Sequence, residues 1–266
     1  MMDELTLRKA LSYIPLGGLR YYEQTDSTNN IALAWAATGA PDLALVYAEE
    51  QTAGRGRGRH RWFTPPGAAL AFSLVLRPLF GQEQATPLYS ALGALAVCEA
   101  LAVHGLYSEI KWPNDVLLNR RKVCGILAES AWLGERVESI VLGVGLNIKP
   151  EAVPPPEQLS FPATCLETEL LPPQHKIETF ERAELVQQIL QAVLYWRGLV
   201  ATDIFIHAWE RRLAFLGDQV EIREDGQALK TGQVDGLEPD GSLRLLSPQG
   251  QTFTIQSGEV HLRPVV

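Results

Sequence analysis

The pattern of the chain changes after Gly217. From there to residue 266, short runs of alternating apolar and polar residues are separated by the turn sequences EDG, EPDG and SPQG. Short alternating runs with a turn about every ten residues are typical of small antiparallel barrels and sandwiches. The sequence therefore predicts two domains, residues 1–215 and residues 216–266, the second of them a small antiparallel barrel.

The first domain mixes helices and strands, which predicts an α+β fold with a mixed sheet and flanking helices. Mostly apolar strands are expected at 43–50, 68–78, 108–112, 115–119, 122–130 and 137–148. Helices are expected at 87–106, 178–199 and 201–215. Residues 149–175 hold seven of the 17 prolines and predict a long loop, which in a compact domain usually has a function.

Composition limits the classes of function. The formal net charge of −8 argues against a general nucleic-acid binder and against strong attraction to anionic membranes. The chain has no apolar run long enough to span a membrane and no signal-peptide pattern. Its three cysteines, Cys98, Cys124 and Cys165, are widely spaced and contain no C-x-x-C, which is typical of reduced thiols. We therefore expect a cytoplasmic protein that binds neither DNA nor membranes.

The stretch GRGRGRHRW, residues 54–62, is a local exception to the acidic balance. Its glycines allow close approach of a ligand to the backbone, and its arginines carry forked donors that match carboxylate and phosphate oxygens. Its place between two apolar strands favours an anion-binding loop. The alternative is a flexible basic loop or an RGG-like nucleic-acid segment, although such segments usually have disordered, polar surroundings. A P-loop is excluded because the G-K-[ST] ending is missing.

The segment KWPNDVLLNRRKVCGILAES, residues 111–130, contains Lys111 and Lys122, two of only six lysines. A hairpin closed near NRR would place Lys122 just beyond the turn, where it could reach a phosphate. Asp115 is a candidate ligand for Mg²⁺, which prefers one or two carboxylates together with phosphate oxygens. The alternative is an ordinary β-hairpin with solvated charges.

Two shorter motifs are ambiguous when taken alone. In GVGLN, Gly143 and Gly145 leave room for a flat ligand and Asn147 could bond a base edge, but a strand-end turn would have the same sequence. In DSTNN, residues 26–30, the hydroxyl and amide groups could bind a ligand or could cap the helix that follows.

Taken together and in this order, the motifs resemble those of the biotin protein ligases. The matching stretches are DSTNN, EEQTAGRGRGRHRW, KWPNDVLLNRRKVCGILAE, VLGVGLNI and the closing GEVHLR, so that the resemblance covers roughly residues 20–266. It implies a catalytic domain like that of class II aminoacyl-tRNA synthetases and lipoate ligases, followed by an SH3-like barrel.

The resemblance also implies a reaction. ATP and Mg²⁺ would activate biotin to biotinyl-5′-AMP, and the biotinyl group would pass to one lysine of a biotin carboxyl carrier protein, a subunit or domain of acetyl-CoA carboxylase. A homodimer is compatible with the family. Only about twenty residues precede the catalytic core, too few for the DNA-binding domain of some members. We therefore expect a ligase that is not also a repressor.

Site roles follow from the matched positions. For biotin, the resemblance implies contacts from Ser27, Thr28, Gln51, Gly54, Arg55, Lys122, Gly143 and Gly145. For ATP and the adenylate, it implies Arg57, Trp62, Lys122 and Asn147. Lys122, Arg57 and Lys111 would be catalytic, with Lys122 the main electrostatic catalyst, and Asp115 would handle Mg²⁺. The Gly-Arg stretch and residues 149–165 would cover the adenylate, which water hydrolyses.

One part of the sequence departs from the family pattern. The family loop runs G-R-G-R-x-G-R-x-W, whereas here His60 stands where the later arginine is expected. Roles for Arg59, His60 and Arg61 are therefore not carried over. Arg263 in GEVHLR faces either the active site or the solvent.

Three other functions compete with a biotin ligase. Lipoate and octanoate ligases or transferases share the fold but lack the combination of GRGRGRHRW with KWPND. A non-catalytic sensor would be expected to lack the cationic residues Arg55, Arg57 and Lys122. A nucleic-acid regulator conflicts with the acidic balance.

Overall fold

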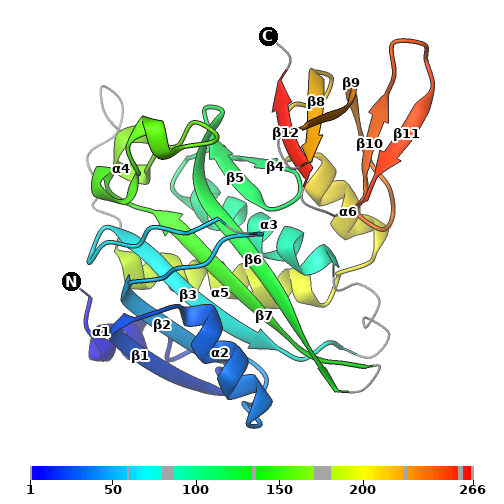
Figure 1. Cartoon of the computed structure of the whole chain (residues 1–266). Helices are drawn as coiled ribbons and strands as arrows, with labels where there is room; N and C mark the ends of the chain where they lie inside the picture. The colour runs from blue at the N-terminus through cyan, green and yellow to red at the C-terminus, as the bar shows by residue number, and fades with distance from the viewer. Residues whose placement is uncertain are drawn as a thin grey trace.

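A seven-stranded mixed sheet carries the first part of the chain (Figure 1). The computed structural model describes residues 2–58, 60–79, 87–133, 136–170, 181–224, 227–256 and 260–264. The strands follow the order β1-β2-β3-β7-β6-β5-β4, and only β1 and β2 are parallel. Their bounds are β1 Gly18–Thr25, β2 Ala44–Gln51, β3 Ala69–Leu76, β4 Glu109–Lys111, β5 Asp115–Leu118, β6 Arg121–Leu133 and β7 Arg136–Asn147.

Helices cover both faces of this sheet. In Figure 1, α2 (Thr28–Ala37) lies in front of it, while α3 (Tyr89–Val103) and α5 (Arg182–Arg197) lie behind it. Val46 of β2 packs in the cluster under α2, whereas its neighbours Leu45 and Tyr47 belong to the main core on the other face. Burial of both faces explains why β2 and β3 have nearly unbroken apolar sequences.

Two N-terminal elements were not predicted. The short helix α1 (Glu4–Ala10) begins at Asp3, whose side chain accepts a hydrogen bond from the Thr6 N–H at 2.7 Å. Strand β1 forms an edge of the sheet and has no fully buried residue. Its sequence GLRYYEQT therefore lacks the apolar run that predicted the central strands.

The proline-rich segment after β7 is ordered over residues 149–170. It contains the 3-10 turns Pro150–Ala152 and Pro156–Gln158 and the one-turn helix α4 (Leu166–Glu169). The predicted loop is therefore partly helical, and its last residues, 171–175, lie outside the described residues.

The C-terminal part follows helix α6 (Asp203–Glu210) and is antiparallel, as predicted. Its strands are β8 Gln219–Glu224, β9 Gln227–Leu237, β10 Leu243–Leu246, β11 Thr252–Ile255 and β12 Val260–Pro264, in the order β11-β10-β9-β8-β12. Over the described residues β11 and β12 are edge strands of an open sheet, so the predicted closed barrel is not confirmed.

One hydrophobic core joins the two parts of the chain. Trp209 and Phe215 belong to the same buried cluster as Val220 and Leu243 of the C-terminal sheet. The division at residue 215 stays a prediction. Across the described stretches, no helix is both long enough and apolar enough to cross a membrane.

The three cysteines are free and buried. Burial raises the pKa of Cys98 to about 11 and raises that of Cys124 well above its ordinary value. These two thiols therefore stay protonated at neutral pH and are poor nucleophiles.

Candidate functional site

The hairpin of β5 and β6 carries the cationic part of the site. Asn119 and Arg120 connect the strands with φ angles of 48° and 59°, the positive values that a two-residue hairpin turn requires. This confirms the predicted hairpin, and it pairs Lys122 with Leu117 across the strands.

Asp115 lies between two lysines. Its Oδ1 is 2.6 Å from Lys122 Nζ, and its Oδ2 is 3.6 Å from Lys111 Nζ. Burial raises the pKa of the Asp115 carboxyl, but the two ammonium groups outweigh burial and hold that pKa below its ordinary value. Two positive charges and one negative charge leave this lysine–aspartate cluster with a net charge of +1, which suits an anionic ligand.

These residues do not fit a magnesium ion held by Asp115. An ammonium group lies near each of its carboxylate oxygens, so a cation bound by Asp115 would be repelled by two positive charges. Over the described part of the chain, no group of three His, Cys, Asp or Glu side chains is placed to hold a metal. The predicted role of Asp115 as a magnesium ligand finds no support in this arrangement.

A floor of small residues crosses the sheet beside this cluster. Gly145 of β7 lies opposite Gly125 of β6 and Ala71 of β3. The indole of Trp62 rests on this floor: a Cβ added to Gly145 would lie 2.3 Å from Trp62 Nε1, and one added to Gly125 would lie 3.1 Å from the ring. The glycines are therefore needed so that a flat group can approach the strands.

Trp62 also lies close to the cationic end of the site. Lys122 Nζ is 5.5 Å from the centroid of the Trp62 ring. The indole nitrogen is buried and has no hydrogen-bond partner among the described residues. Such a donor is available to a ligand that enters the pocket.

The Gly-Arg stretch folds back on itself as a small hairpin. The Trp62 N–H donates to Gly54 O at 2.9 Å, and the Gly56 N–H donates to His60 O at 2.8 Å. Gly58 has a φ of 63°, a value that favours glycine, and lies in the connection between the two arms. The glycine that departs from the family spacing thus serves this turn, while Arg59 lies outside the described residues.

Arg55 and Arg61 face each other across this hairpin. The Arg55 guanidinium forms an ion pair with Glu129 of β6 and donates to Asn30 Oδ1 at 2.9 Å. Like charges on directly opposite residues repel each other. The ion pair with Glu129 offsets the charge of Arg55 and so reduces its repulsion of Arg61.

The other end of the site is polar and uncharged. Gln51 Oε1 accepts hydrogen bonds from the Thr28 N–H at 2.8 Å and from the Thr28 hydroxyl at 3.1 Å, while Gln51 Nε2 donates to Thr64 at 3.0 Å. Ser27 is the N-cap residue of α2, but its side chain makes no capping bond. This polar network is held at the C-terminal end of β2 by the first turn of α2.

Asn29 connects the polar end to the sheet. Its amide donates to Glu129 at 2.9 Å and its Oδ1 accepts from the Ser73 hydroxyl at 2.5 Å. A Cβ on Gly143 would lie 2.1 Å from Asn29 Oδ1. The glycine at 143 therefore makes room for Asn29, and both residues line the pocket.

The proline-rich segment forms one wall. The Lys122 N–H donates to Pro162 O and the Thr164 N–H donates to Lys122 O, both at 2.8 Å. Asn147 Nδ2 donates to Thr164 O at 3.0 Å. This segment thus pairs with the backbone of Lys122 and lies directly over the cationic end.

Glu169 of α4 fastens this wall to the hairpin. Its carboxylate accepts hydrogen bonds from Arg121 at 2.7 Å, from Asn119 at 2.6 Å and from the Thr164 hydroxyl at 2.5 Å. The Glu169 side chain is only 3% exposed, so these three donors satisfy a carboxylate that water hardly reaches.

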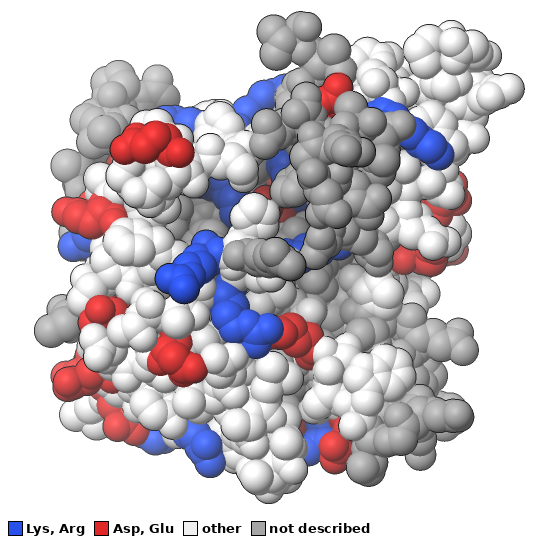
Figure 2. Space-filling model, in the orientation of Figure 1, with Lys and Arg blue, Asp and Glu red and all other residues white. Residues whose placement is uncertain are grey.

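These elements enclose a pocket of about 740 Å³. Figure 2 shows a hollow in this face of the molecule with Lys and Arg side chains gathered around it. His60 and Arg61, for which no role was predicted, line the pocket. The residues with a predicted role that line it are Ser27, Thr28, Gln51, Arg55, Arg57, Trp62, Lys111, Asp115, Lys122, Gly143, Gly145 and Asn147. Gly54 is not among them, because it packs against the Trp62 backbone. Arg263 lies in β12, opposite Glu221 of β8, and its role stays a prediction.

Several pocket residues were not predicted. Asn29 was within the quoted DSTNN motif, and Gly125 was within the lysine segment, but neither spacing marked them out. Phe161, whose ring lies 5.1 Å from Lys111 Nζ, comes from the proline-rich segment. Glu129 lies within β6 and is not a lining residue of the pocket; no sequence pattern marked it out, and only the folded sheet places it beside Arg55.

Known proteins are similar to this chain in sequence and in fold. Residues 21–147 match the Biotin/lipoate A/B protein ligase family. The chain is 35% identical to the biotin–[acetyl-CoA-carboxylase] ligase of Paracoccus denitrificans, over 86% of this chain and 94% of that protein. It is 33% identical to the ligase of the same name from Mycobacterium tuberculosis, over 98% of this chain and 96% of that protein. The structure is similar to biotin protein ligase from Aquifex aeolicus in complex with biotin and ATP, with a TM-score of 0.76 and 26% identity over 93% of this chain and 99% of that one.

Proposed function

The chain belongs to the biotin protein ligases, which activate biotin with ATP and attach it to a carrier protein, and we propose that the pocket described above carries both steps. The observation that carries this assignment is the division of the pocket into two ends. Thr28 and Gln51 form an uncharged polar end, whereas Lys111 and Lys122 form a cationic end with a net positive charge.

The two ends suit the two halves of the biotin molecule. Three strand spacings separate β2 from β6, or roughly 14 Å, which leaves room for an elongated ligand. The ureido ring offers donors and acceptors to Ser27, Thr28 and Gln51. The carboxylate at the other end of biotin is then drawn toward Arg55 and Lys122.

The first step joins two anions. The biotin carboxylate attacks the α-phosphorus of ATP, the bond to the bridging oxygen breaks, and pyrophosphate leaves. Lys122 and Arg57 offset the charge on the attacking carboxylate and on the α-phosphate, and Lys111 offsets charge on the departing group. Asp115 keeps the two ammonium groups in fixed positions, so the reacting groups meet a preformed positive field.

The second step transfers the biotinyl group. The ε-amine of a carrier lysine attacks the mixed anhydride, an amide forms, and AMP leaves. The Gly-Arg hairpin and the 159–163 wall flank the pocket from two sides and limit access of water to the anhydride. Trp62 stacks on the adenine. Asn147, whose Nδ2 donates one hydrogen to Thr164 O, forms a hydrogen bond to the adenine with the rest of its amide group.

The finer assignments follow from the family. The carrier is a biotin carboxyl carrier protein of acetyl-CoA carboxylase, and the reaction takes place in the cytoplasm. The C-terminal sheet corresponds to an SH3-like domain that assists binding of ATP and of the carrier.

Incubation with biotin, ATP, Mg²⁺ and a carrier domain tests the function. The expected result is one biotin added to one carrier lysine, detected by mass spectrometry, together with biotin-dependent exchange of pyrophosphate into ATP. Parallel reactions with lipoate and octanoate serve as controls. Exchange that responds to lipoate or octanoate and not to biotin would overturn the assignment.

A further inference from the structure

The β4–β5 hairpin, which carries Lys111 and Asp115, is attached to the C-terminal part of the chain along its outer edge. The Ile110 N–H donates to Arg212 O at 2.6 Å, and the Ala214 N–H donates to Ile110 O at 2.9 Å. Strand β4 has only three residues. Its position therefore depends on what lies beside it, namely β5 on one side and residues 212–214 on the other.

Trp112 makes a second connection immediately after Lys111. Its side chain is buried, with 1% exposure, and its indole N–H donates to Gly241 O at 2.9 Å. Gly241 lies in the turn between β9 and β10 of the C-terminal sheet. A direct hydrogen bond thus joins the residue next to Lys111 to the other part of the chain.

The turn that supplies this carbonyl has little freedom. The Gly241 N–H donates to Glu238 O at 2.9 Å, and the Ser242 N–H donates to Asp240 Oδ1 at 2.9 Å. Gly241 has a φ of 82°, and an added Cβ would lie 2.5 Å from Leu88 and 2.8 Å from Trp209. Surrounding groups therefore fix the position of the Gly241 carbonyl.

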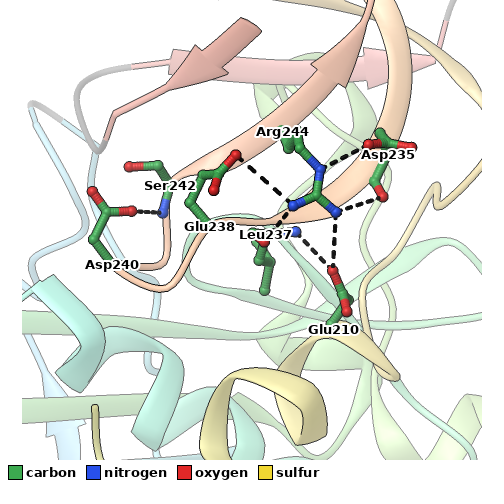
Figure 3. Close-up of polar contacts among 7 residues, drawn as sticks. All are labelled: Glu210, Asp235, Leu237, Glu238, Asp240, Ser242 and Arg244. Atoms are coloured by element: carbon green, nitrogen blue, oxygen red, sulfur yellow. Dashed lines mark hydrogen bonds and ion pairs between the residues drawn. The ribbon is translucent and has the colours of Figure 1, made fainter. Parts of the chain in front are cut away.

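Arg244 ties this turn to α6, as Figure 3 shows. Its guanidinium donates to Asp235 Oδ2 at 2.7 Å and to Leu237 O at 2.9 Å, and it lies 3.7 Å from Glu210 Oε1. The same Glu210 oxygen accepts the Leu237 N–H at 2.9 Å. Glu210 is the last residue of α6, so both strands beside the turn are attached to the helix.

We propose that the β9–β10 turn positions the lysine–aspartate cluster for adenylate formation, with Trp112 as the positioning residue. Because the indole bond to Gly241 fixes the backbone beside Lys111, it also fixes where Lys111 and its hairpin partner Asp115 meet. Asp115 in turn holds Lys122. This inference rests on the proposed function of that cluster, and it assigns the C-terminal sheet a part in the first chemical step.

The variant Trp112→Phe tests the proposal, because it keeps a ring and removes only the N–H donor and part of the indole. We expect the kcat of biotin-dependent pyrophosphate exchange to fall about 10- to 100-fold, the range for a small displacement of a catalytic group. The KM for biotin should keep its wild-type value, because the polar end of the pocket is untouched. Reaction of the Lys111 ε-amine with an acetylating reagent, read by mass spectrometry, should rise several-fold.

Trp196→Phe is the matched control. Trp196 of α5 is also buried, with 7% exposure, but its ring packs against Tyr195 and Phe205 rather than against Gly241. The control variant loses the same atoms, but its kcat and its Lys111 acetylation should keep their wild-type values. Equal effects of the two variants, or wild-type values of both readouts in Trp112→Phe, would overturn the proposal.

A second variant covers a failure of Trp112→Phe to fold. Arg244→Gln leaves Trp112 and Gly241 in place but removes the ion pairs that hold the turn. Like Trp112→Phe, this variant should raise Lys111 acetylation and lower the kcat of pyrophosphate exchange. Wild-type values of both readouts would overturn the proposal. An absence of biotin-dependent exchange in the wild type would contradict the proposed function alone, and the acetylation results would still decide the positioning role.

Discussion

Lys122 Nζ lies 2.6 Å from Asp115 Oδ1, so the lysine at the turn of the hairpin is bound to the carboxylate at its base. The Asp115 side chain is 13% exposed and that of Lys122 is 27% exposed. A carboxylate this buried requires paired charges. Because Asp115 is paired with both Lys122 and Lys111, loss of either ammonium group still leaves the carboxylate with a partner.

Replacement of Lys122 by alanine tests its role as electrostatic catalyst. Loss of a charged contact to the phosphate should lower the rate of biotin-dependent pyrophosphate exchange by about 10²- to 10³-fold. Folding should survive, because Lys111 still offsets the charge of Asp115. The exposed Lys149 provides the control, and Lys149→Ala should exchange at the wild-type rate. A normal rate in Lys122→Ala would remove Lys122 from the mechanism.

Acid should reveal the ion pairs of Asp115. Burial raises the pKa of this carboxyl, but Lys122 and Lys111 lower it more, so the folded pKa lies below the ordinary value of 3.8. The unfolded chain then takes up the proton first as the pH falls. The stabilisation is therefore fully present above about pH 4 and is lost below it, as the pH falls through the folded pKa.

The comparison of wild type with Asp115→Asn measures this effect. The Tm of the wild type should fall more between pH 7 and pH 3 than that of Asp115→Asn. Glu157→Gln removes an exposed carboxylate, and its Tm should fall between pH 7 and pH 3 as much as that of the wild type. Parallel loss of Tm in the wild type and Asp115→Asn would show that the ion pairs add nothing to stability.

The hairpin of Lys122 was predictable, whereas the pairing of its charges was not. A two-residue turn after an apolar strand is a local signal, and it placed Lys122 correctly. The distance from Lys122 to Asp115 depends on the register of β5 and β6, which has an irregularity between Val116 and Leu117. The bulge moves residues relative to their partners in a way that alternation does not reveal.

Other features of the site depend on contacts between distant segments. Arg55 and Glu129 are 74 residues apart, and no pattern in either segment indicates the other. Trp112 and Gly241 are 129 residues apart, and the bond between them depends on how the C-terminal sheet packs. Sequence order predicted which residues have suitable chemistry, while tertiary packing determined their partners.

Gly145→Ala should disturb the nucleotide end of the pocket. The new Cβ would lie 2.3 Å from Trp62 Nε1, so the indole must move away from the glycine floor. Overpacking of this kind costs about 1–3 kcal/mol, and we expect a higher KM for ATP in the exchange assay. Gly198→Ala is the control, since the nearest atom to its Cβ is 3.9 Å away. An unchanged KM for ATP in Gly145→Ala would exclude Trp62 from the adenine site.

Glu169→Gln should loosen the wall over Lys122. The amide keeps the size of the side chain but loses the charge that Arg121 contacts, and its NH₂ group cannot accept a hydrogen bond. A free energy of unfolding lower by about 1–3 kcal/mol is expected in urea titrations. The control is Glu167→Gln, an exposed residue in the same helical turn. Equal stabilities of the two variants would show that the Glu169 contacts contribute little.

Arg57→Gly should weaken retention of the adenylate. Arg57 lines the pocket from the Gly-Arg hairpin, and in the proposed function its guanidinium offsets the phosphate charge of the bound intermediate. Without it, biotinyl-5′-AMP should escape into solution and label lysines on unrelated proteins, detected by mass spectrometry of a mixture of carrier and albumin. Arg57→Lys keeps the charge and should label the carrier with less escape than Arg57→Gly. Unaltered selectivity for the carrier in Arg57→Gly would show that other groups hold the adenylate, and Lys122 would then be the first to examine.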